Sequence, residues 1–212
     1  VGKAGIKKRY FCQGRSDTIT RHPEVIAEWA KVGMHYLFIG LEGFRDKDLD
    51  NMKKGTNLSK NNEAVRICHQ FGVKVRGGFI IMPDFDKKDF KNMSKYIRAS
   101  GVDTFSPAVY TPLPGTELWE EKKNEFITDN YDHFDFSHPI FPTKLPLKQF
   151  YKEYFNTLGR VFTLPKKIKF LMGMNPELRR KFIQNYKFIR RSLTDFGENY
   201  MPINNNRKQE EK

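Results

Sequence analysis

Cysteine and long apolar runs are the two features that this sequence most clearly lacks. It has 2 cysteines in 212 residues, Cys12 and Cys68, and their separation gives neither a disulfide framework nor a metal-ligand spacing. Few cysteines are typical of a cytosolic protein, and we expect a cytoplasmic location. No run is long and apolar enough for a signal peptide or a spanning helix. These absences argue against a secreted disulfide scaffold and against an integral membrane protein.

Acidic residues are scarce relative to basic ones. The 38 Lys and Arg outnumber the 25 Asp and Glu, so the formal net charge is +13. Such a surplus favours anionic partners, namely nucleic acid, phosphates or an acidic membrane surface. No RNA-binding motif appears, and the basic residues alternate with helix-core positions, so a nucleic-acid-binding module is the weaker alternative. With 19 Phe, the chain has enough apolar material for one sizeable domain with an appendage.

A helix that ends in glycine and leads directly into a strand recurs along the first half of the chain. Gly33, Gly72 and Gly101 each follow a helical pattern and precede an apolar run. In the first helix, Val25, Ile26, Trp29 and Val32 would lie on one face. The expected helices span residues 22–32, 59–71 and 86–100, and the expected strands lie at 8–13, around 37, at 73–82 and at 102–110. This alternation predicts an α/β fold, with a parallel βα-repeat sheet and the helices outside it.

The pattern changes after residue 110. Residues 111–115 form a turn-rich segment, 117–124 a short helix and 131–147 an aromatic and proline-rich loop. Helices are expected at 146–162 and 176–193, and residues 201–212 are expected to be frayed. In the loop, the spacing of Asp132, His133, Asp135 and His138 suggests a metal site, but the aromatic neighbours favour a packed loop. We therefore divide the chain into a βα part, residues 1–125, and a helical C-terminal extension, residues 126–212.

Glycine and charge gather at the expected carboxyl ends of the strands. The apolar run that begins at Tyr36 ends in glycines on either side of Glu42. A carboxylate there can accept hydrogen bonds from both hydroxyls of a ribose, and a nearby lysine can pair with a ligand carboxylate. By position alone, a helix-capping or salt-bridging Glu42 is an equal interpretation. For Gly77 and Gly78 alone, close packing of helix on strand is the stronger one.

An ordered set of motifs resembles radical S-adenosylmethionine (SAM) enzymes. Their order is similar to that in the later, C-terminal half of the family's (β/α)6 partial TIM barrel. Residues 131–138 and 142–147 resemble the subgroup with an N-terminal cobalamin-binding domain, especially the hopanoid C-3 methylases and their relatives. The resemblance covers roughly residues 10–154. The motifs are RSD at 15–17, FIGLEG at 38–43, MKKG at 52–55, GGFIIMP at 77–83 and YTPLPGTEL at 110–118.

The resemblance implies a SAM site and its residues. Glu42 would bind the SAM ribose, and Lys54 or its neighbour Lys53 would meet the methionyl carboxylate. The strand from Gly77 would line the adenine, although Ile81 replaces the glycine that the family usually has there. Asp17 would lie on the rim beside the cofactor. The cofactor-binding residues implied in this way are Arg15, Glu42, Lys54, Gly77, Gly78 and Tyr110.

The family's Cys-x3-Cys-x2-Cys motif, which holds a [4Fe–4S] cluster, is absent, as is a cobalamin-binding segment. We therefore expect the carboxyl-terminal portion of a longer enzyme, inactive by itself, and we assign no catalytic residue and no metal ligand. Its partners would be the missing N-terminal barrel half and the cobalamin domain. The resemblance implies a methyltransferase that acts on an unactivated carbon of a lipid-like or other small molecule. A radical cyclase or methylthiotransferase, acting on a porphyrin or tRNA, is the alternative.

Residues 165–193 are rich in Lys and Arg, and Glu177 is the lone acid among them. Apolar residues repeat there every three or four positions. One interpretation is a helix packed on the barrel with a solvated basic back. The other is a peripheral contact with an anionic surface, here the inner membrane.

Overall fold

The computed structural model describes residues 5, 8–51, 56–162, 168 and 171–199. The chain divides into two compact units. The first comprises Val1–Ile81 with Lys95–Ala108, and the second comprises Met82–Ser94 with Val109–Lys212. Whether the predicted parts, 1–125 and 126–212, are separate domains stays a prediction. The expectation of a frayed end at 201–212 lies outside the described residues.

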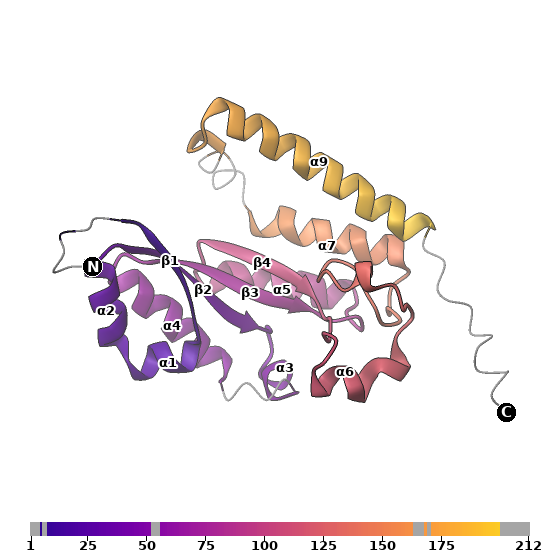
Figure 1. Cartoon of the computed structure of the whole chain (residues 1–212), viewed down its shortest axis with the longest axis horizontal. Coiled ribbons are helices and arrows are strands. Elements are labelled where there is room, and N and C mark those ends of the chain that lie inside the picture. Colours follow the sequence, from indigo (N-terminus) through magenta and orange to yellow (C-terminus); the bar gives the residue numbers. More distant parts are fainter. Residues whose placement is uncertain (1–4, 6–7, 52–55, 163–167, 169–170, 200–212) are drawn as a thin grey trace. The chain divides into compact units, whose positions relative to one another are not determined.

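A four-stranded sheet runs through the structure in the order β1-β2-β3-β4, so each strand neighbours the next one along the chain (Figure 1). β1 pairs in parallel with β2, and β2 in parallel with β3. The predicted α/β fold with a parallel sheet is therefore confirmed. The strands are β1 (Tyr10–Gly14), β2 (Met34–Glu42), β3 (Lys74–Ile81) and β4 (Thr104–Val109).

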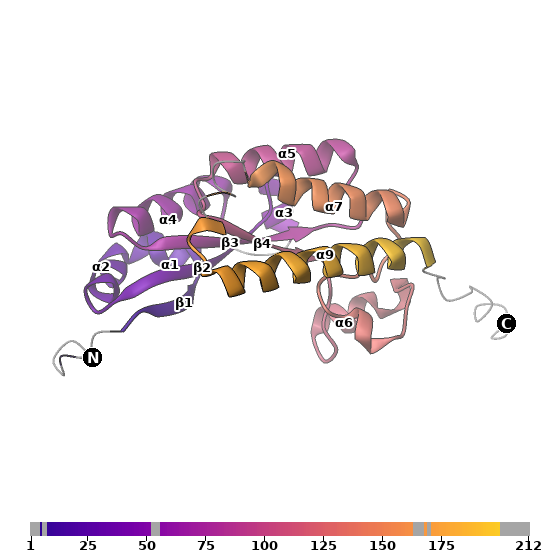
Figure 2. The same cartoon turned by 90° about the horizontal axis from the view of Figure 1, so that it is seen from above.

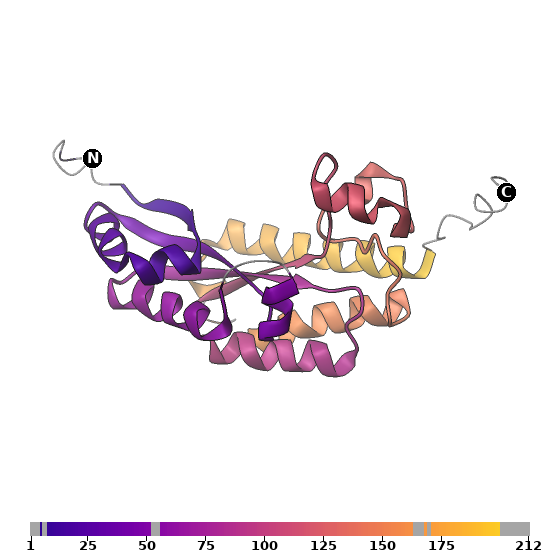
Figure 3. The ribbon, with the colours of Figure 1, turned by 90° about the horizontal axis from the view of Figure 1, so that it is seen from below.

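Helices cover one face of the sheet in the first unit. α1, α2 and α4 contact β2, and α4 also contacts β3 (Figure 1); Figure 3 views the molecule from the side on which these helices lie. Leu37, Ile39 and Leu41 alternate along β2, so they share one face of the strand, and they are at most 2% exposed. The alternate residues of β2 project from the opposite face. The helices of the first half are α1 (Ser16–Arg21), α2 (Pro23–Lys31), α3 (Asp46–Asn51), α4 (Leu58–Gln70) and α5 (Lys87–Ala99).

Each predicted glycine stop is confirmed by its backbone conformation. Gly33, Gly72 and Gly101 have φ of +106°, +73° and +81°. L-residues rarely adopt this left-handed region, so glycine ends the helix there and lets the chain turn directly into the next strand. Two short helices, α1 and α3, were not predicted.

The apolar face predicted for α2 is only partly buried. Ile26 is 6% exposed, but Val25 and Trp29 are each 46% exposed. The helix contacts α1, α4 and β2, and this contact covers only one side of it. Helical spacing predicted which residues share a side, but it cannot say how wide the covered strip is.

Aromatic side chains organise the second unit. The Trp119 ring lies 4.9 Å from that of Phe126 and 4.8 Å from that of Phe134, and Phe90 meets Phe150 at 5.4 Å. α7 and α9 run side by side and antiparallel (Figure 2), and Phe155 of α7 contacts Tyr186 of α9. The predicted helices are confirmed. The unit contains α6 (Glu117–Lys122), η2 (Lys123–Glu125), η3 (Tyr131–His133), α7 (Leu147–Val161) and α9 (Pro176–Asn199).

The two histidines of the aromatic loop contact residues that lie close to them in the chain. His133 Nδ1 lies 2.9 Å from Thr128 Oγ1, and His138 Nδ1 lies 3.0 Å from Asp135 Oδ1. Among the residues that the structure describes, no group of three or more His, Cys, Asp and Glu side chains is placed to hold a metal ion. These contacts, with the surrounding rings, give the packed loop that the sequence favoured.

Candidate cofactor pocket

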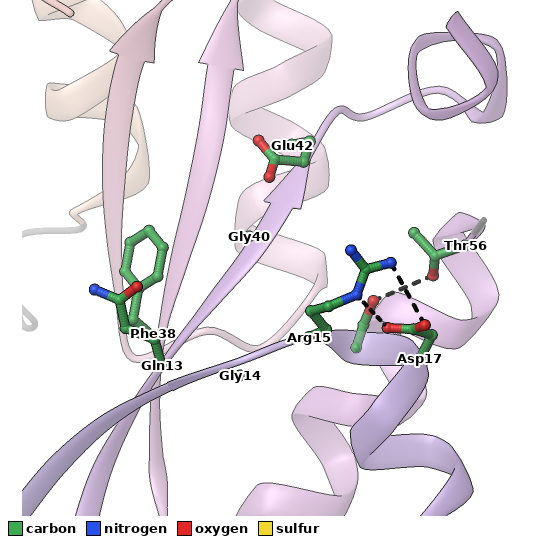
Figure 4. Close-up of a pocket in the computed structure, with 9 residues that line it drawn as sticks. Gln13, Gly14, Arg15, Asp17, Phe38, Gly40, Glu42 and Thr56 are labelled. Carbon is green, nitrogen blue, oxygen red and sulfur yellow. Dashed lines mark hydrogen bonds and ion pairs between the residues drawn. The ribbon is translucent and has the colours of Figure 1, made fainter. Parts of the chain in front are cut away.

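A cavity of about 300 Å³ opens at the carboxyl ends of β1 and β2 (Figure 4). Open α/β sheets bind their ligands at this edge, because the loops that follow the strands can supply polar groups there. A volume of this size is at the lower end of that found for small-molecule sites. The cavity is lined by Gln13, Gly14, Arg15, Ser16, Asp17, Phe38, Gly40, Glu42 and Thr56.

Glu42 lies in this cavity on a distorted end of its strand. The register between β2 and β3 shifts between Gly40 and Glu42, which is a β-bulge. Glu42 itself has φ of +65°, a left-handed conformation that a residue with a Cβ adopts at a cost of roughly 1–3 kcal/mol. The Gly43 amide donates to the Leu41 carbonyl at 2.8 Å and closes a tight turn around Glu42. A strained backbone conformation of this kind persists only where the surrounding structure stabilises it.

Gly40 supplies the space that the Glu42 carboxylate occupies. A Cβ at position 40 would lie 2.5 Å from Glu42 Oε1, so any side chain there would compete with the carboxylate. At Gly43, a Cβ would lie 2.7 Å from the Cβ of Asp48, so this second glycine lets α3 approach closely. The sequence Gly-Leu-Glu-Gly therefore folds a carboxylate back over its own strand, at the pocket.

The loop after β1 contributes charge of the opposite sign. Arg15 Nε donates to Asp17 Oδ1 at 2.9 Å (Figure 4), and Arg21 reaches the other oxygen of the same carboxylate at 3.2 Å. The hydrogen bond from Arg15 lowers the pKa of Asp17. Asp17 therefore stays ionised and holds the Arg15 guanidinium at the cavity, where it offers a cation beside Glu42.

Phe38 adds an aromatic wall, which sequence analysis missed. A Cβ at Gly78 would lie 2.6 Å from Phe38 Cζ, so the glycine makes room for the ring. At Gly77 a Cβ would meet the side chains of Phe79, Leu41 and Val102 at 2.9–3.1 Å. Both glycines serve close packing in this structure, and their contact with a cofactor stays a prediction. The signal for Phe38 was its position two residues before Gly40, on the same face of the strand.

Two implied residues cannot be placed with the others. Lys54 and its neighbour Lys53 lie outside the described residues. Tyr110 belongs to the second unit, where its ring stacks on Phe141 at 5.5 Å, and burial raises its pKa. The structure thus brings Arg15, Asp17 and Glu42 to one pocket. It adds Ser16 and Thr56, which sequence analysis did not single out.

An iron–sulfur cluster does not fit the cysteines of this chain. Cluster ligation needs several thiolates close together. Cys68 is fully buried, and burial raises the pKa of its thiol to about 12. Cys12 is the second of the 2 cysteines in the chain. We therefore derive no chemical step at a cluster from these residues.

Known proteins share sequence with this chain over most of its length. No family model matches the chain. Over 157 residues, 74% of the chain, it is 34% identical to a hopanoid C-3 methylase of Methylococcus capsulatus, of which the match covers 30%. It is 28% identical over 163 residues to an uncharacterized methyltransferase of Pyrococcus horikoshii, covering 76% of this chain and 34% of that relative.

A solved structure shares the fold. The match with the cobalamin-dependent S-adenosylmethionine radical enzyme OxsB covers 91% of this chain and 34% of the OxsB chain. Its TM-score is 0.52 and the sequence identity is 16%. The chain therefore spans about a third of the length of these relatives. With the sequence matches, the chain is homologous to the cobalamin-dependent radical SAM methyltransferases.

Proposed function

We propose that the chain is the SAM-binding, carboxyl-terminal half of a (β/α)6 partial barrel. It belongs to a longer cobalamin-dependent radical SAM methyltransferase that acts on an unactivated carbon of a lipid-like substrate. One observation carries the SAM assignment. The Glu42 carboxylate is held, at the cost of backbone strain, in a pocket at the carboxyl edge of the sheet.

The pocket residues suit the parts of SAM. A carboxylate can accept hydrogen bonds from both hydroxyls of a ribose, and such charge-assisted bonds are the stronger kind. The Phe38 ring offers an apolar surface to a purine. Arg15 offers a cation to a carboxylate, as the methionyl end of SAM requires. The work of this chain is to bind and orient SAM, while the cluster and cobalamin of the longer protein would supply electrons and the methyl group.

The open edge of the sheet supports the barrel half. β1 is an edge strand, and Phe11 on it is 56% exposed. An exposed edge strand with apolar side chains is prone to pair with another strand. We propose that the last strand of the preceding barrel half pairs here. The chain alone would then be poorly soluble, as the unpaired edge predicts.

The test uses the longer protein, with its cluster reconstituted and reduced without oxygen. We expect it to bind SAM and release 5′-deoxyadenosine, and to transfer a labelled methyl group into a lipid extract. Label in porphyrin or tRNA, or a cyclised product, would favour the alternative activities. A reconstituted protein that neither binds nor cleaves SAM would overturn the proposal.

We also propose that α9 contacts an anionic bilayer, so that the protein works in the cytoplasm at the inner membrane. Leu178, Phe188 and Ile189 on α9 are 51%, 71% and 52% exposed. Exposed cations lie on the same helix, so apolar side chains could enter the interface while cations meet headgroups. In the part of the chain that the structure describes, no helix is long and apolar enough to cross a membrane. Three of these exposed cations are Arg180, Lys187 and Arg191.

Co-sedimentation with vesicles tests this contact. We expect salt-sensitive binding to vesicles of anionic lipid and little binding to neutral ones, because salt screens the headgroup attraction. Changing Arg180, Lys187 and Arg191 to Glu should abolish it. The matched control changes three exposed lysines of α5 to Glu and should bind as the parent does. Equal binding by both triple variants would show that α9 is not the contact. The control lysines are Lys87, Lys88 and Lys91.

A further inference from the structure

A partly buried chain of uncharged side chains connects the start of α1 to the strained turn at Glu42. Ser16 Oγ lies 3.1 Å from Thr56 Oγ1, and that contact is drawn in Figure 4. Thr56 Oγ1 donates to Asn61 Oδ1 at 3.3 Å, and Asn61 Nδ2 donates to the Leu41 carbonyl at 3.0 Å. Since the hydroxyl proton of Thr56 is used for Asn61, Ser16 is the donor in the first bond.

The amide of Asn61 is fully buried, with 0% exposure. Taking a polar group out of water costs free energy unless its hydrogen bonds are made. A fully buried amide in an apolar helix layer therefore lowers the stability of the fold unless it is hydrogen-bonded. Asn61 lies in the first turns of α4, on the side that carries buried Ala64 and Val65. If the residue at this position served packing alone, an apolar side chain would give a more stable fold.

The bond from Asn61 goes to the carbonyl that defines the turn at Glu42. The Leu41 carbonyl accepts the Gly43 amide at 2.8 Å as well as the Asn61 amide at 3.0 Å. Leu41 is also the residue that the shifted register with β3 leaves without a partner strand residue. Asn61 therefore fixes, from α4, the orientation of the peptide that precedes Glu42.

We propose that Asn61 is a positioning residue for SAM binding. It holds the Leu41 peptide in place and thereby keeps Glu42 in its left-handed conformation, with the carboxylate over Gly40. Without this bond the turn relaxes, and the carboxylate moves away from the position in which it would meet the ribose. The inference rests on the proposed role of Glu42 as the ribose acceptor.

The test is a double-mutant cycle on SAM affinity in the longer protein, measured by calorimetry together with the melting temperature. Asn61→Ala should weaken SAM binding by about tenfold. In a Glu42→Ala background it should weaken binding no further, because it acts only through Glu42. Asn61→Leu keeps a similar size but has no donor, and it should behave like Asn61→Ala. Asn62→Ala is the matched control, since Asn62 is the exposed neighbour whose Oδ1 accepts from Tyr96 instead.

The outcomes separate this inference from the proposed function. If Glu42→Ala weakens SAM binding but Asn61→Ala adds its full effect in the double variant, Asn61 is only structural and the inference fails alone. If Glu42→Ala leaves the affinity unchanged, the proposed role of Glu42 and the inference fail together. If Asn61→Ala does not fold, Asn61→Leu, which is of similar size and puts no unpaired charge into the core, gives the same comparison, and affinity equal to the parent overturns the inference.

Discussion

Glu42→Ala is expected to weaken SAM binding to the longer protein by roughly 10- to 100-fold. The change removes a charged acceptor of hydrogen bonds, which is worth about 1.5–3 kcal/mol, and 1.4 kcal/mol is a factor of ten in affinity. Calorimetric titration with SAM, on protein with an intact cluster, measures the change. Glu63→Ala is the matched control, because Glu63 is an exposed carboxylate that pairs at 3.7 Å with Arg66 on the surface of α4.

A second change at the same position separates binding from stability. Glu42→Gly also removes the carboxylate, but glycine adopts a positive φ without strain. This variant should bind SAM as weakly as Glu42→Ala and yet unfold at a higher temperature than it does. Unchanged SAM affinity in both variants would reject Glu42 as the ribose acceptor. Equal melting temperatures would show that the turn stores no strain.

The largest effect on stability is expected for Gly33→Ala. Gly33 has φ of +106°, and a Cβ there would lie 1.9 Å from the Lys8 carbonyl oxygen. The Gly33 carbonyl also accepts the Tyr10 amide at 2.9 Å, so neither backbone segment can move without breaking the start of β1. We expect a loss of about 3 kcal/mol or more. A domain of this size should then melt roughly 6–12 °C lower.

Two other glycines serve as references for the loss of stability expected at Gly33. Gly72 also has a positive φ, +73°, but a Cβ there would meet nothing within 4 Å. Gly72→Ala therefore reports the conformational cost alone, roughly 1 kcal/mol. Gly159 lies inside α7 with open space around it, so Gly159→Ala should stabilise slightly. A Gly33→Ala loss no larger than that of Gly72→Ala would contradict the close approach to Lys8.

The sequence predicted the features that depend on residues close together in the chain. Gly33 and Gly72 were recognised as stops because helical periodicity ends there and a strand pattern begins at once. The parallel sheet followed from the βα alternation. α1, by contrast, is six residues of largely polar sequence beginning at Ser16, too short to show a periodic face. Local patterns therefore predicted the sheet and its main helices but not the short helix beside the pocket.

Sequence patterns predicted pocket residues only where these residues lie at the end of a single strand. Glu42 was found because glycines surround it, whereas Arg15 was implied by the resemblance to the family. The bulge depends on how β3 pairs with β2, which no pattern in β2 reveals. Thr56 and Asn61 lie far along the chain from Leu41, so their part in the site exists only after folding. Polar residues of this kind look like ordinary helix and loop surface in the sequence.

The chain of bonds beneath Glu42 has a consequence for acidity. Its members are the hydroxyls of Ser16 and Thr56, the amide of Asn61 and the carbonyl of Leu41. None of these groups gains or loses a proton across roughly pH 4–10. Had a histidine or a carboxylate occupied any of these positions, protonation would have altered the support of the turn. The support of the turn at Glu42 is therefore the same in acid and in base. We expect any effect of pH on the proposed SAM binding to arise from SAM or from charged groups outside this chain of bonds.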